Sequence, residues 1–176
     1  NQEYDWVIDC TGYTLLKKKK MDIIFEPRIT LLYQSYIKNF ALMMMDGPFW
    51  SIYPHEKNFY TLGSVKYSRL NKGLKSFERA KKVINEINQK KVKQIVMNFE
   101  KQISKDFVEF KKYFRYKSFY TSVATVFNSK VDERPLIIHK NRRIISVLGG
   151  KIDTIIEAEK KNTKNYKLIL LFLEHL

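Results

Sequence analysis

The stretch from Phe40 to Tyr67 constrains the fold of this chain more than any other part of the sequence. It contains two runs rich in aromatic, β-branched and other apolar residues, separated by the polar segment 54–58. Such runs are typical of strands, and a short polar segment between them is typical of a hairpin turn. The first run is interrupted at Asp46-Gly47-Pro48, which indicates either a structural kink or the edge of a binding site. The stretch therefore predicts a long β-hairpin with one irregularity.

The segments on either side of this hairpin extend the predicted sheet. Glu26-Pro27-Arg28 should open a strand over residues 29–37, because a proline disturbs a strand least at its start. Lys38-Asn39 predicts a two-residue turn, so residues 23–67 are expected to form a three-stranded antiparallel meander. The aromatic and β-branched segment 114–127 and the shorter segments 135–138 and 144–148 also favour strands.

Between these strands lies a long amphipathic pattern. Its apolar residues recur mostly at steps of three and four, which is the spacing of one helix face. They are Phe77, Ala80, Ile84, Ile87, Ile95, Phe99, Ile103, Phe107 and Phe110. Ser76 is a suitable N-cap. The pattern weakens over residues 88–91, so it predicts either one long helix with a break or two helices placed end to end.

Charge is the second strong feature of the chain. There are 33 Lys and Arg against 18 Asp and Glu, which gives a formal net charge of +15. This basicity favours an acidic partner such as nucleic acid, an anionic membrane or a phosphorylated ligand. The joint abundance of Lys, Ile, Asn, Tyr and Phe is also typical of an AT-rich coding sequence, with the lysines on a solvated helix face. A basic module that binds nucleic acid through the helical region 77–110 stays open as an alternative.

Two junctions between a strand and glycine, one near each end of the chain, carry the strongest chemical signal. Residues 4–10 form an apolar run that predicts a buried, parallel strand, and Thr11-Gly12 closes it. The strand predicted over 144–148 leads into Gly149-Gly150 and a helical run over 151–160. Glycines let a backbone approach a ligand, and a helix N-terminus offers free N–H groups. If both strands belong to one sheet, the two junctions frame one ligand.

Several other kinds of site are not indicated. The single cysteine, Cys10, excludes an intramolecular disulfide, and the sequence shows no zinc-ligand spacing, no Gly-x-Gly-x-x-Gly and no Walker pattern. Neither a signal peptide nor an apolar run of membrane-spanning length is present, which predicts a cytoplasmic protein. Arg134 is a candidate to hold a carboxylate or phosphate, or else to form a surface ion pair with Asp132.

Taken in order, these segments resemble the D-amino-acid-oxidase-like (DAO-like) FAD-dependent oxidoreductases. The strand that ends in Thr11-Gly12 is similar to a strand of their FAD-binding domain. Residues 51–54 and 59–63 resemble the hairpin of their substrate domain. A subgroup is matched by Met45-Asp46-Gly47-Pro48-Phe49, by Asp132 and Arg134, and by Gly150-Lys151-Ile152-Asp153. The resemblance extends over nearly the whole chain.

The resemblance implies two sets of site residues. Those expected near the flavin are Thr11, Gly12, Gly149, Gly150, Lys151 and Ile152. Those expected on the substrate side are Asp46, Phe49, Tyr53, Tyr60 and Arg134. No metal site is expected, and neither a general base nor a substrate is identified.

The chain also departs from this family in two respects. The glycine-rich dinucleotide fingerprint is missing, so this chain alone should bind FAD poorly or not at all and should be inactive as a fragment. The family places an arginine for a substrate carboxylate on the strand that matches Phe119–Phe127, and this chain has none there. An amino acid substrate is therefore not expected.

The combined expectation is an α+β fold in which an antiparallel sheet is backed by one long or broken amphipathic helix. Residues 1–22 would be a remnant strand of a FAD-binding domain, 23–142 a substrate-like antiparallel domain, and 143–176 the closing strand and helix. The chain would be the C-terminal part of an oxidoreductase that transfers a hydride from substrate to FAD. The alternatives are a basic nucleic-acid-binding module and a fragment that forms a homodimer through exposed apolar surface.

Overall fold

The computed structural model describes residues 4, 7–12, 22–128, 136–149, 154 and 156–158. The fold is α+β, as predicted, with mostly antiparallel strands and the main helices in one block. The chain divides into two compact units: a central unit, Phe25–Ala124, and a terminal unit formed by Asn1–Ile24 and Thr125–Leu176. The predicted division into residues 1–22, 23–142 and 143–176 stays a prediction.

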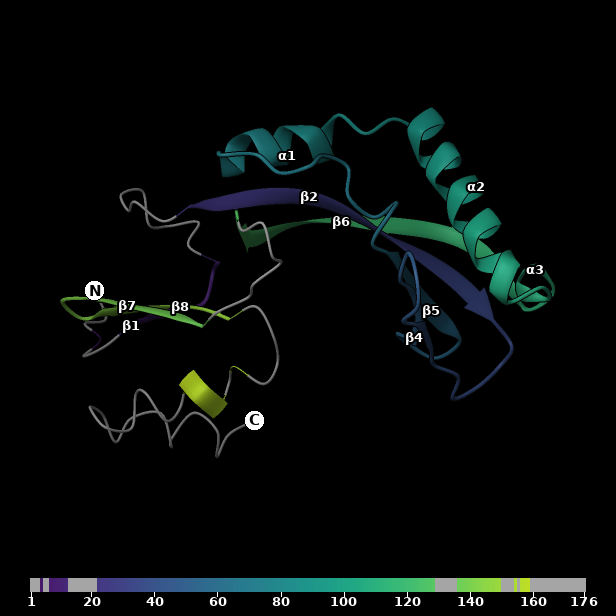
Figure 1. Ribbon diagram of the computed structural model, residues 1–176, viewed down its shortest axis with the longest axis horizontal. Helices are drawn as coiled ribbons and strands as arrows, with labels where there is room; N and C mark the ends of the chain where they lie inside the picture. The colour runs from purple at the N-terminus through teal and green to yellow at the C-terminus, as the bar shows by residue number, and fades with distance from the viewer. Residues whose placement is uncertain are drawn as a thin grey trace. The chain divides into compact units, whose positions relative to one another are not determined.

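The central unit is built on a five-stranded sheet (Figure 1). Its strands, in the order β3-β4-β5-β2-β6, are β3 (Leu42–Met44), β4 (Trp50–Pro54), β5 (Phe59–Ser64), β2 (Ile23–Ser35) and β6 (Phe114–Phe127). The pairs β3–β4, β4–β5 and β5–β2 are antiparallel, with Ile52 opposite Leu62 and Tyr33 opposite Tyr60. The strand predicted over 114–127 is confirmed.

The meander predicted for residues 23–67 is wrong in its connections. β2 pairs with β5 and not with β3, so Lys38-Asn39 does not form a hairpin turn between neighbouring strands. The single strand expected before residue 54 is folded back on itself as the hairpin β3–β4. Asp46-Gly47-Pro48 lies in the turn of that hairpin, where Gly47 has a φ of 75°. A glycine accepts this left-handed conformation without the steric cost of a Cβ atom.

Pro27 does not begin its strand, as the sequence had suggested. β2 starts at Ile23, four residues earlier. The strand tolerates the proline because β5 pairs only with Leu31–Gln34, so no ladder bond from β5 is required at Pro27. The carbonyl of Pro27 instead accepts a 2.9 Å hydrogen bond from the backbone N–H of Leu70.

The amphipathic region forms separate helices, α1 (Phe77–Asn85) and α2 (Gln89–Asp106), followed by the single turn α3 (Phe110–Tyr113). Each of the two longer helices has its own N-cap. Ser76 Oγ accepts from the N–H of Arg79 at 3.3 Å, and Asn88 Oδ1 accepts from the N–H of Lys91 at 2.9 Å. The backbone of Asn88 is extended, so this residue separates α1 from α2. Of the two alternatives, the chain adopts two helices end to end.

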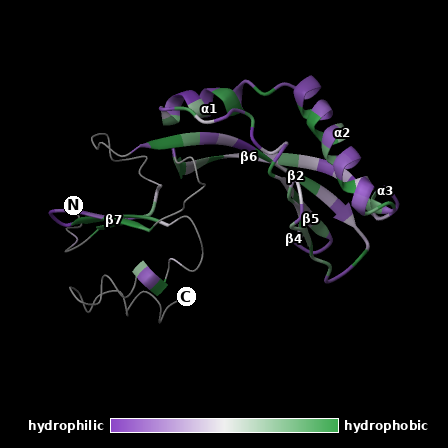
Figure 2. Ribbon diagram, viewed as in Figure 1, coloured by the Kyte–Doolittle hydropathy of each residue, from purple (hydrophilic) through white to green (hydrophobic). Residues whose placement is uncertain are grey.

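The core of the central unit lies between α2 and one face of the sheet. Val92, Ile95, Phe99 and Ile103 of α2 are buried, together with Leu31, Tyr33, Trp50, Ile52, Tyr60 and Leu62 of the strands. Figure 2 shows the resulting alternation of hydrophobic and hydrophilic residues along α2. Phe110 and Phe114 stack at a centroid distance of 5.1 Å and close the end of this core. Ile84 on α1 and Ile87 after α1 belong to the predicted apolar helix face, but both are only half-buried.

The terminal unit contains a three-stranded sheet in the order β1-β8-β7, with β1 (Val7–Asp9), β8 (Ile144–Leu148) and β7 (Ile137–Asn141). β7 and β8 form an antiparallel hairpin, and β1 runs parallel to β8. Thr154 and Ile156–Ala158 are helical. The rest of the helix predicted over 151–160, and the tail after it, lie outside the described residues.

The orientation predicted for the first strand is confirmed, but its burial is not. β1 is parallel to its neighbour, yet Val7 and Ile8 are 46% and 44% exposed. The buried residue of the strand is the acidic Asp9, at 6% exposure. β1 has one hydrogen-bonded neighbour among the described strands, so its apolar side chains are covered less than those of an inner strand. No helix in the described ranges is long and apolar enough to cross a membrane.

Candidate functional site

The carboxyl ends of β1 and β8 meet at one edge of the terminal sheet. In the parallel register Val7 lies opposite Ile144 and Asp9 opposite Ser146. Thr11-Gly12 follows β1, and Gly149 follows β8, each a few residues beyond the last pair. The two strand-to-glycine junctions therefore belong to the same edge. Ligands of open sheets with parallel strands bind outside such carboxyl ends.

A buried carboxylate organises this edge. Asp9 Oδ1 accepts hydrogen bonds from the backbone N–H of Thr11 at 2.9 Å and from its Oγ1 hydroxyl at 2.5 Å. Asp9 Oδ2 accepts from the Oγ hydroxyl of Ser146 on β8 at 3.1 Å. One side chain thus shapes the turn after β1 and also ties β1 to β8.

The hydrogen bonds set the ionisation of Asp9. Burial by itself would raise the pKa of this carboxyl, but the bonds from Thr11 and Ser146 stabilise the charged form and hold the pKa below its ordinary value. Asp9 is therefore an anion at neutral pH. The pKa of the neighbouring Cys10 thiol is raised, first by burial and then by the negative charge of Asp9. Cys10 is thus poorly suited to act as a thiolate nucleophile.

Gly12 occupies a position that a larger residue would not fit. Its φ is 71°, in the left-handed region. A Cβ atom at this position would lie 2.9 Å from Oγ1 of Thr125, closer than real Cβ contacts come. The turn therefore requires glycine for its conformation and for its packing, and it presents bare backbone at the sheet edge.

The structure brings together three of the six residues predicted to lie near a flavin. Thr11, Gly12 and Gly149 share the sheet edge formed by β1 and β8. Gly150, Lys151 and Ile152 lie outside the described residues, as does Arg134. Within the described ranges, no three His, Cys, Asp or Glu side chains form a cluster that could hold a metal ion.

The residues predicted for the substrate side do not share one face of the central sheet. Tyr53 on β4 is 40% exposed and Phe49, just before β4, is 43% exposed. Asp46 is exposed in the β3–β4 turn. Tyr60 on β5 is 1% exposed and belongs to the core under α2. Successive side chains of a strand point to opposite faces of the sheet. Tyr53 pairs with Thr61, the neighbour of Tyr60, so the two tyrosines point to opposite faces.

The hydroxyls of these two tyrosines also have different surroundings. The Tyr60 hydroxyl donates to the backbone carbonyl of Ile37 in the loop after β2. The Tyr53 hydroxyl lies 3.8 Å from the sulfur of Met43 on the neighbouring strand. Tyr60 therefore stabilises the fold, whereas Tyr53 and Met43 present a partly exposed aromatic and thioether surface.

Asp9 and Ser146 were missed as site residues by the sequence reasoning. A signal for Asp9 was present, since Asp followed two residues later by Thr is typical of a turn in which the carboxylate accepts from the backbone. Ser146 carried no such signal. Its role depends on the pairing of two strands that lie 137 residues apart in sequence.

No family model matches this chain, and comparison with curated proteins shows similarity to a flavoprotein. The FAD-dependent monooxygenase FPY4 of Fusarium mangiferae is 28% identical to this chain over 160 residues. The aligned region is 90% of this chain but 42% of that protein, so the chain spans less than half the length of its relative. The similarity supports a relationship to FAD-dependent oxidoreductases in general, and it does not distinguish the DAO-like subgroup.

Proposed function

We propose that this chain is part of a FAD-dependent oxidoreductase in which the carboxyl edge of β1 and β8 borders the flavin ring. One observation carries the proposal: two parallel, hydrogen-bonded strands end in Thr11-Gly12 and Gly149 at the same edge. The similarity to a FAD-dependent monooxygenase supports it. That relative is a monooxygenase, whereas the resemblance in sequence implies hydride removal from substrate. Both are oxidations that use bound flavin.

The groups at this edge suit a flavin ring better than a phosphate. Gly12 offers bare backbone, while the Thr11 and Ser146 hydroxyls are already donating to Asp9. The anionic Asp9 behind the turn would repel a pyrophosphate. The sequence also contains no glycine-rich phosphate loop of the Gly-x-Gly-x-x-Gly type. We therefore assign the ring, and not the phosphates, to this edge.

A bound flavin would supply the electron acceptor. The residues described here would position its ring: Asp9 fixes the turn at Thr11-Gly12, and the pairing of β1 with β8 sets the distance between the two junctions. Gly149 extends this edge, and Gly150, Lys151 and Ile152 stay predicted neighbours of the ring. None of the described residues at the edge has the geometry of a general base, because both oxygens of Asp9 are occupied.

An NMR titration of the isotopically labelled chain tests the assignment. Riboflavin and FAD should shift the amide signals of Gly12 and Gly149, and they should do so at similar weak affinity, because the phosphates make no contact here. Gly47 and Gly63 in the central unit serve as internal references that should not move. An absence of shifts at Gly12 and Gly149 with both ligands would argue against a flavin at this edge.

A further inference from the structure

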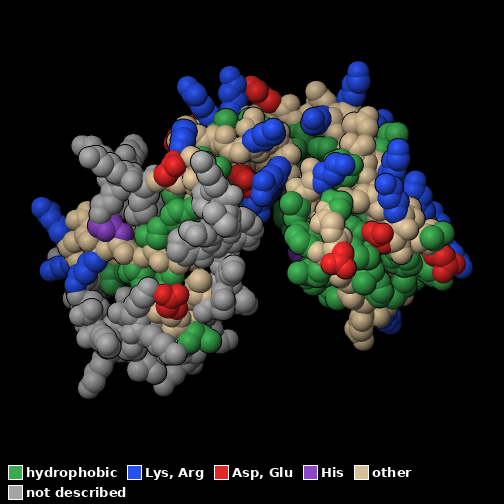
Figure 3. Space-filling model, viewed as in Figure 1, with side chains coloured by type: hydrophobic (Ala, Val, Ile, Leu, Met, Phe, Trp, Pro, Cys, Tyr) green, Lys and Arg blue, Asp and Glu red, His purple; other side chains and the backbone are tan. Residues whose placement is uncertain are grey.

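The positive charge of the chain is concentrated in the helical block of the central unit. Residues 72–117 carry fourteen Lys or Arg against five Asp or Glu, in about a quarter of the sequence. Figure 3 shows lysine and arginine side chains gathered over this block. The surface is therefore strongly basic where α1, α2 and α3 lie.

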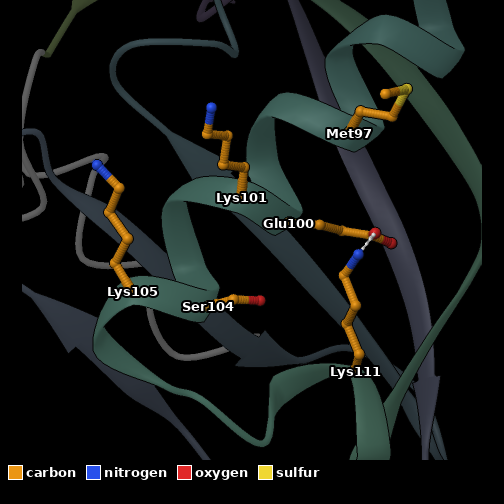
Figure 4. Close-up of a pocket in the computed structure, with 6 residues that line it drawn as sticks. All are labelled: Met97, Glu100, Lys101, Ser104, Lys105 and Lys111. Carbon is orange, nitrogen blue, oxygen red and sulfur yellow. Dashed lines mark ion pairs between the residues drawn. The ribbon is translucent and has the colours of Figure 1, made fainter.

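Part of this charge forms one continuous surface along α2. Two shallow grooves share Lys101 and Lys105 in their walls. One, of about 450 Å³, also includes Lys66, and the other, of about 520 Å³, also includes Lys111 and Met97 (Figure 4). We call the surface formed by Lys66, Lys101, Lys105 and Lys111 the basic ridge.

Three carboxylates lie in the two grooves with the four lysines of the basic ridge. Lys111 forms a 3.0 Å ion pair with Glu100, drawn as a dashed line in Figure 4. The other carboxylates in the two grooves are Asp46 and Asp106. Asp106 accepts a 2.8 Å hydrogen bond from Nε1 of Trp50, which holds it against the sheet.

The lysines at the centre of the basic ridge are free of ion pairs. Lys101 and Lys105, one turn apart on α2, have no such partner in the part of the chain that the structure describes. Lys66 lies 5.2 Å from the ring centre of Tyr67. The two grooves therefore have one more lysine than carboxylates, within a block of fourteen Lys or Arg against five Asp or Glu.

Two exposed apolar residues lie close to these lysines in sequence, and one of them, Met97, also lines a groove. Met97, one turn before Lys101, is 63% exposed, and Val108, between Lys105 and Lys111 in sequence, is 81% exposed. Aromatic residues of the same block are buried instead, with Phe99 and Phe110 at 0% exposure and Phe114 at 3%. Tyr67 lines the groove that includes Lys66, but it is half-buried and Lys66 lies over its ring. The surface thus combines cations with exposed aliphatic groups and one covered aromatic ring.

We infer that the basic ridge docks the chain on an anionic phospholipid surface. Lysines near a negatively charged bilayer gain electrostatic energy, and exposed aliphatic side chains enter the headgroup region. Single-stranded nucleic acid fits less well, because its bases stack on exposed aromatic rings, and the ring in the described groove walls, Tyr67, is half-buried and covered by Lys66. The apolar face of α2 is already buried against the sheet, so contact with the bilayer is peripheral and mainly electrostatic.

Sedimentation with vesicles tests this inference. The purified chain should bind vesicles made of equal parts phosphatidylserine and phosphatidylcholine, and it should not bind vesicles of phosphatidylcholine alone. Salt should release it, since raising the ionic strength from about 0.01 M to about 1 M shortens the Debye length from about 30 Å to about 3 Å. Binding to both vesicle types, or to neither at low salt, would overturn the inference.

Two double variants locate the contact. Lys101→Ala with Lys105→Ala should weaken vesicle binding about 25-fold, since each lysine near an anionic surface contributes a factor of about five. Lys38→Ala with Lys57→Ala removes the same charge from exposed loop residues that line neither groove, and it should leave most of the affinity. Equal losses in the two variants would show that net charge, and not the basic ridge, is responsible.

A third variant and a competitor separate the remaining explanations. Met97→Ala should weaken binding at low salt without changing how binding depends on salt, because an apolar contact is not screened. Met97 is 63% exposed, so its truncation should leave the fold intact. A single-stranded oligonucleotide should bind more weakly than the anionic vesicles at the same salt. If the oligonucleotide binds more tightly than the vesicles, and the Lys101 and Lys105 variant loses this binding, the partner is nucleic acid and the inference is wrong.

Discussion

Ser146 on β8 donates a 3.1 Å hydrogen bond to Oδ2 of Asp9 on β1, so two residues 137 positions apart in sequence join the strands of the candidate site. The other oxygen of the same carboxylate shapes the turn that leads to Gly12. Asp9 is 6% exposed, and its carboxylate accepts the three hydrogen bonds described for it, two from Thr11 and one from Ser146. Asp9 therefore controls both the geometry of the turn and its distance from β8.

Replacement of Asp9 by Asn should destabilise the terminal unit by about 1–3 kcal/mol. The Asn amide can keep one acceptor for Thr11, but its NH₂ group cannot accept from Ser146. Ser146→Ala should cost less, about 1 kcal/mol, because the carboxylate keeps both bonds from Thr11. Urea unfolding followed by circular dichroism measures both values, and equal stability of the wild type and the Asn variant would show that the network contributes nothing.

The same carboxylate predicts a pH dependence of defined sign. Its folded-state pKa lies below the ordinary value of 3.8, so it contributes stability that is fully present above that pH. This contribution disappears as pH falls through the lower folded-state pKa. The stability difference between wild type and Asp9→Asn should therefore be constant near neutral pH and shrink below about pH 4. A difference that grows on acidification would contradict the lowered pKa.

Gly12→Ala should destabilise the chain more than Gly47→Ala. Both glycines have positive φ, 71° and 75°, so each substitution carries a similar conformational cost of about 1–2 kcal/mol. Only Gly12 has a close neighbour, Oγ1 of Thr125, whereas a Cβ at Gly47 meets nothing within 4 Å. In a double-mutant cycle, Thr125→Ala should recover part of the loss at Gly12. Full additivity of the two changes would mean that the contact has no energetic effect.

Gln102 should be essential for the attachment of α2 to the sheet. Its Oε1 accepts from Oγ of Ser64 at 2.8 Å, and its Nε2 donates to the carbonyl of Pro48 at 2.6 Å. The side chain is 9% exposed, so Gln102→Ala leaves buried polar groups unpaired at a cost of about 1–3 kcal/mol. Gln94→Ala is the matched control, because its hydrogen bond to Asn98 is exposed. Thermal unfolding should separate the two variants clearly.

Core truncations should distinguish α2 from the link between α1 and α2. Ile103 on α2 is fully buried, so Ile103→Ala is expected to cost about 2–5 kcal/mol. Ile87, between α1 and α2, is half-buried against the core, and Ile87→Ala should cost about 1 kcal/mol. Denaturant unfolding of both variants tests the order, and a larger loss at Ile87 would place the core nearer α1.

Local features of the fold were predictable because the sequence carries them within a few residues. The N-cap Ser76 and the spacing of apolar residues located the helical region, and the weakened pattern over residues 88–91 marked the place of a break, where the structure shows Asn88 as a second N-cap. The aromatic and β-branched residues of the segment 114–127 identified β6. The glycine at position 12 marked a turn with special backbone conformation, and the structure shows that conformation.

The pairing of strands was not predictable in the same way. Sequence order suggested that β2 would pair with the next strand, yet it pairs with β5, because hydrogen bonds between strands depend on long-range packing under α2. A shift of one residue also reverses which side chains face the core. Tyr53 and Tyr60 were therefore expected on one side but lie on opposite faces of the sheet.

The sequence by itself determined the α+β class, the positions of the helices and most strands, and the glycine turn after the first strand, since short-range spacing and backbone sterics encode these features. Only the tertiary structure decided that the first and last described strands are parallel neighbours and that Asp9 meets Ser146. Contacts between residues so far apart in sequence arise when the whole chain buries its apolar surface, and no local pattern records them.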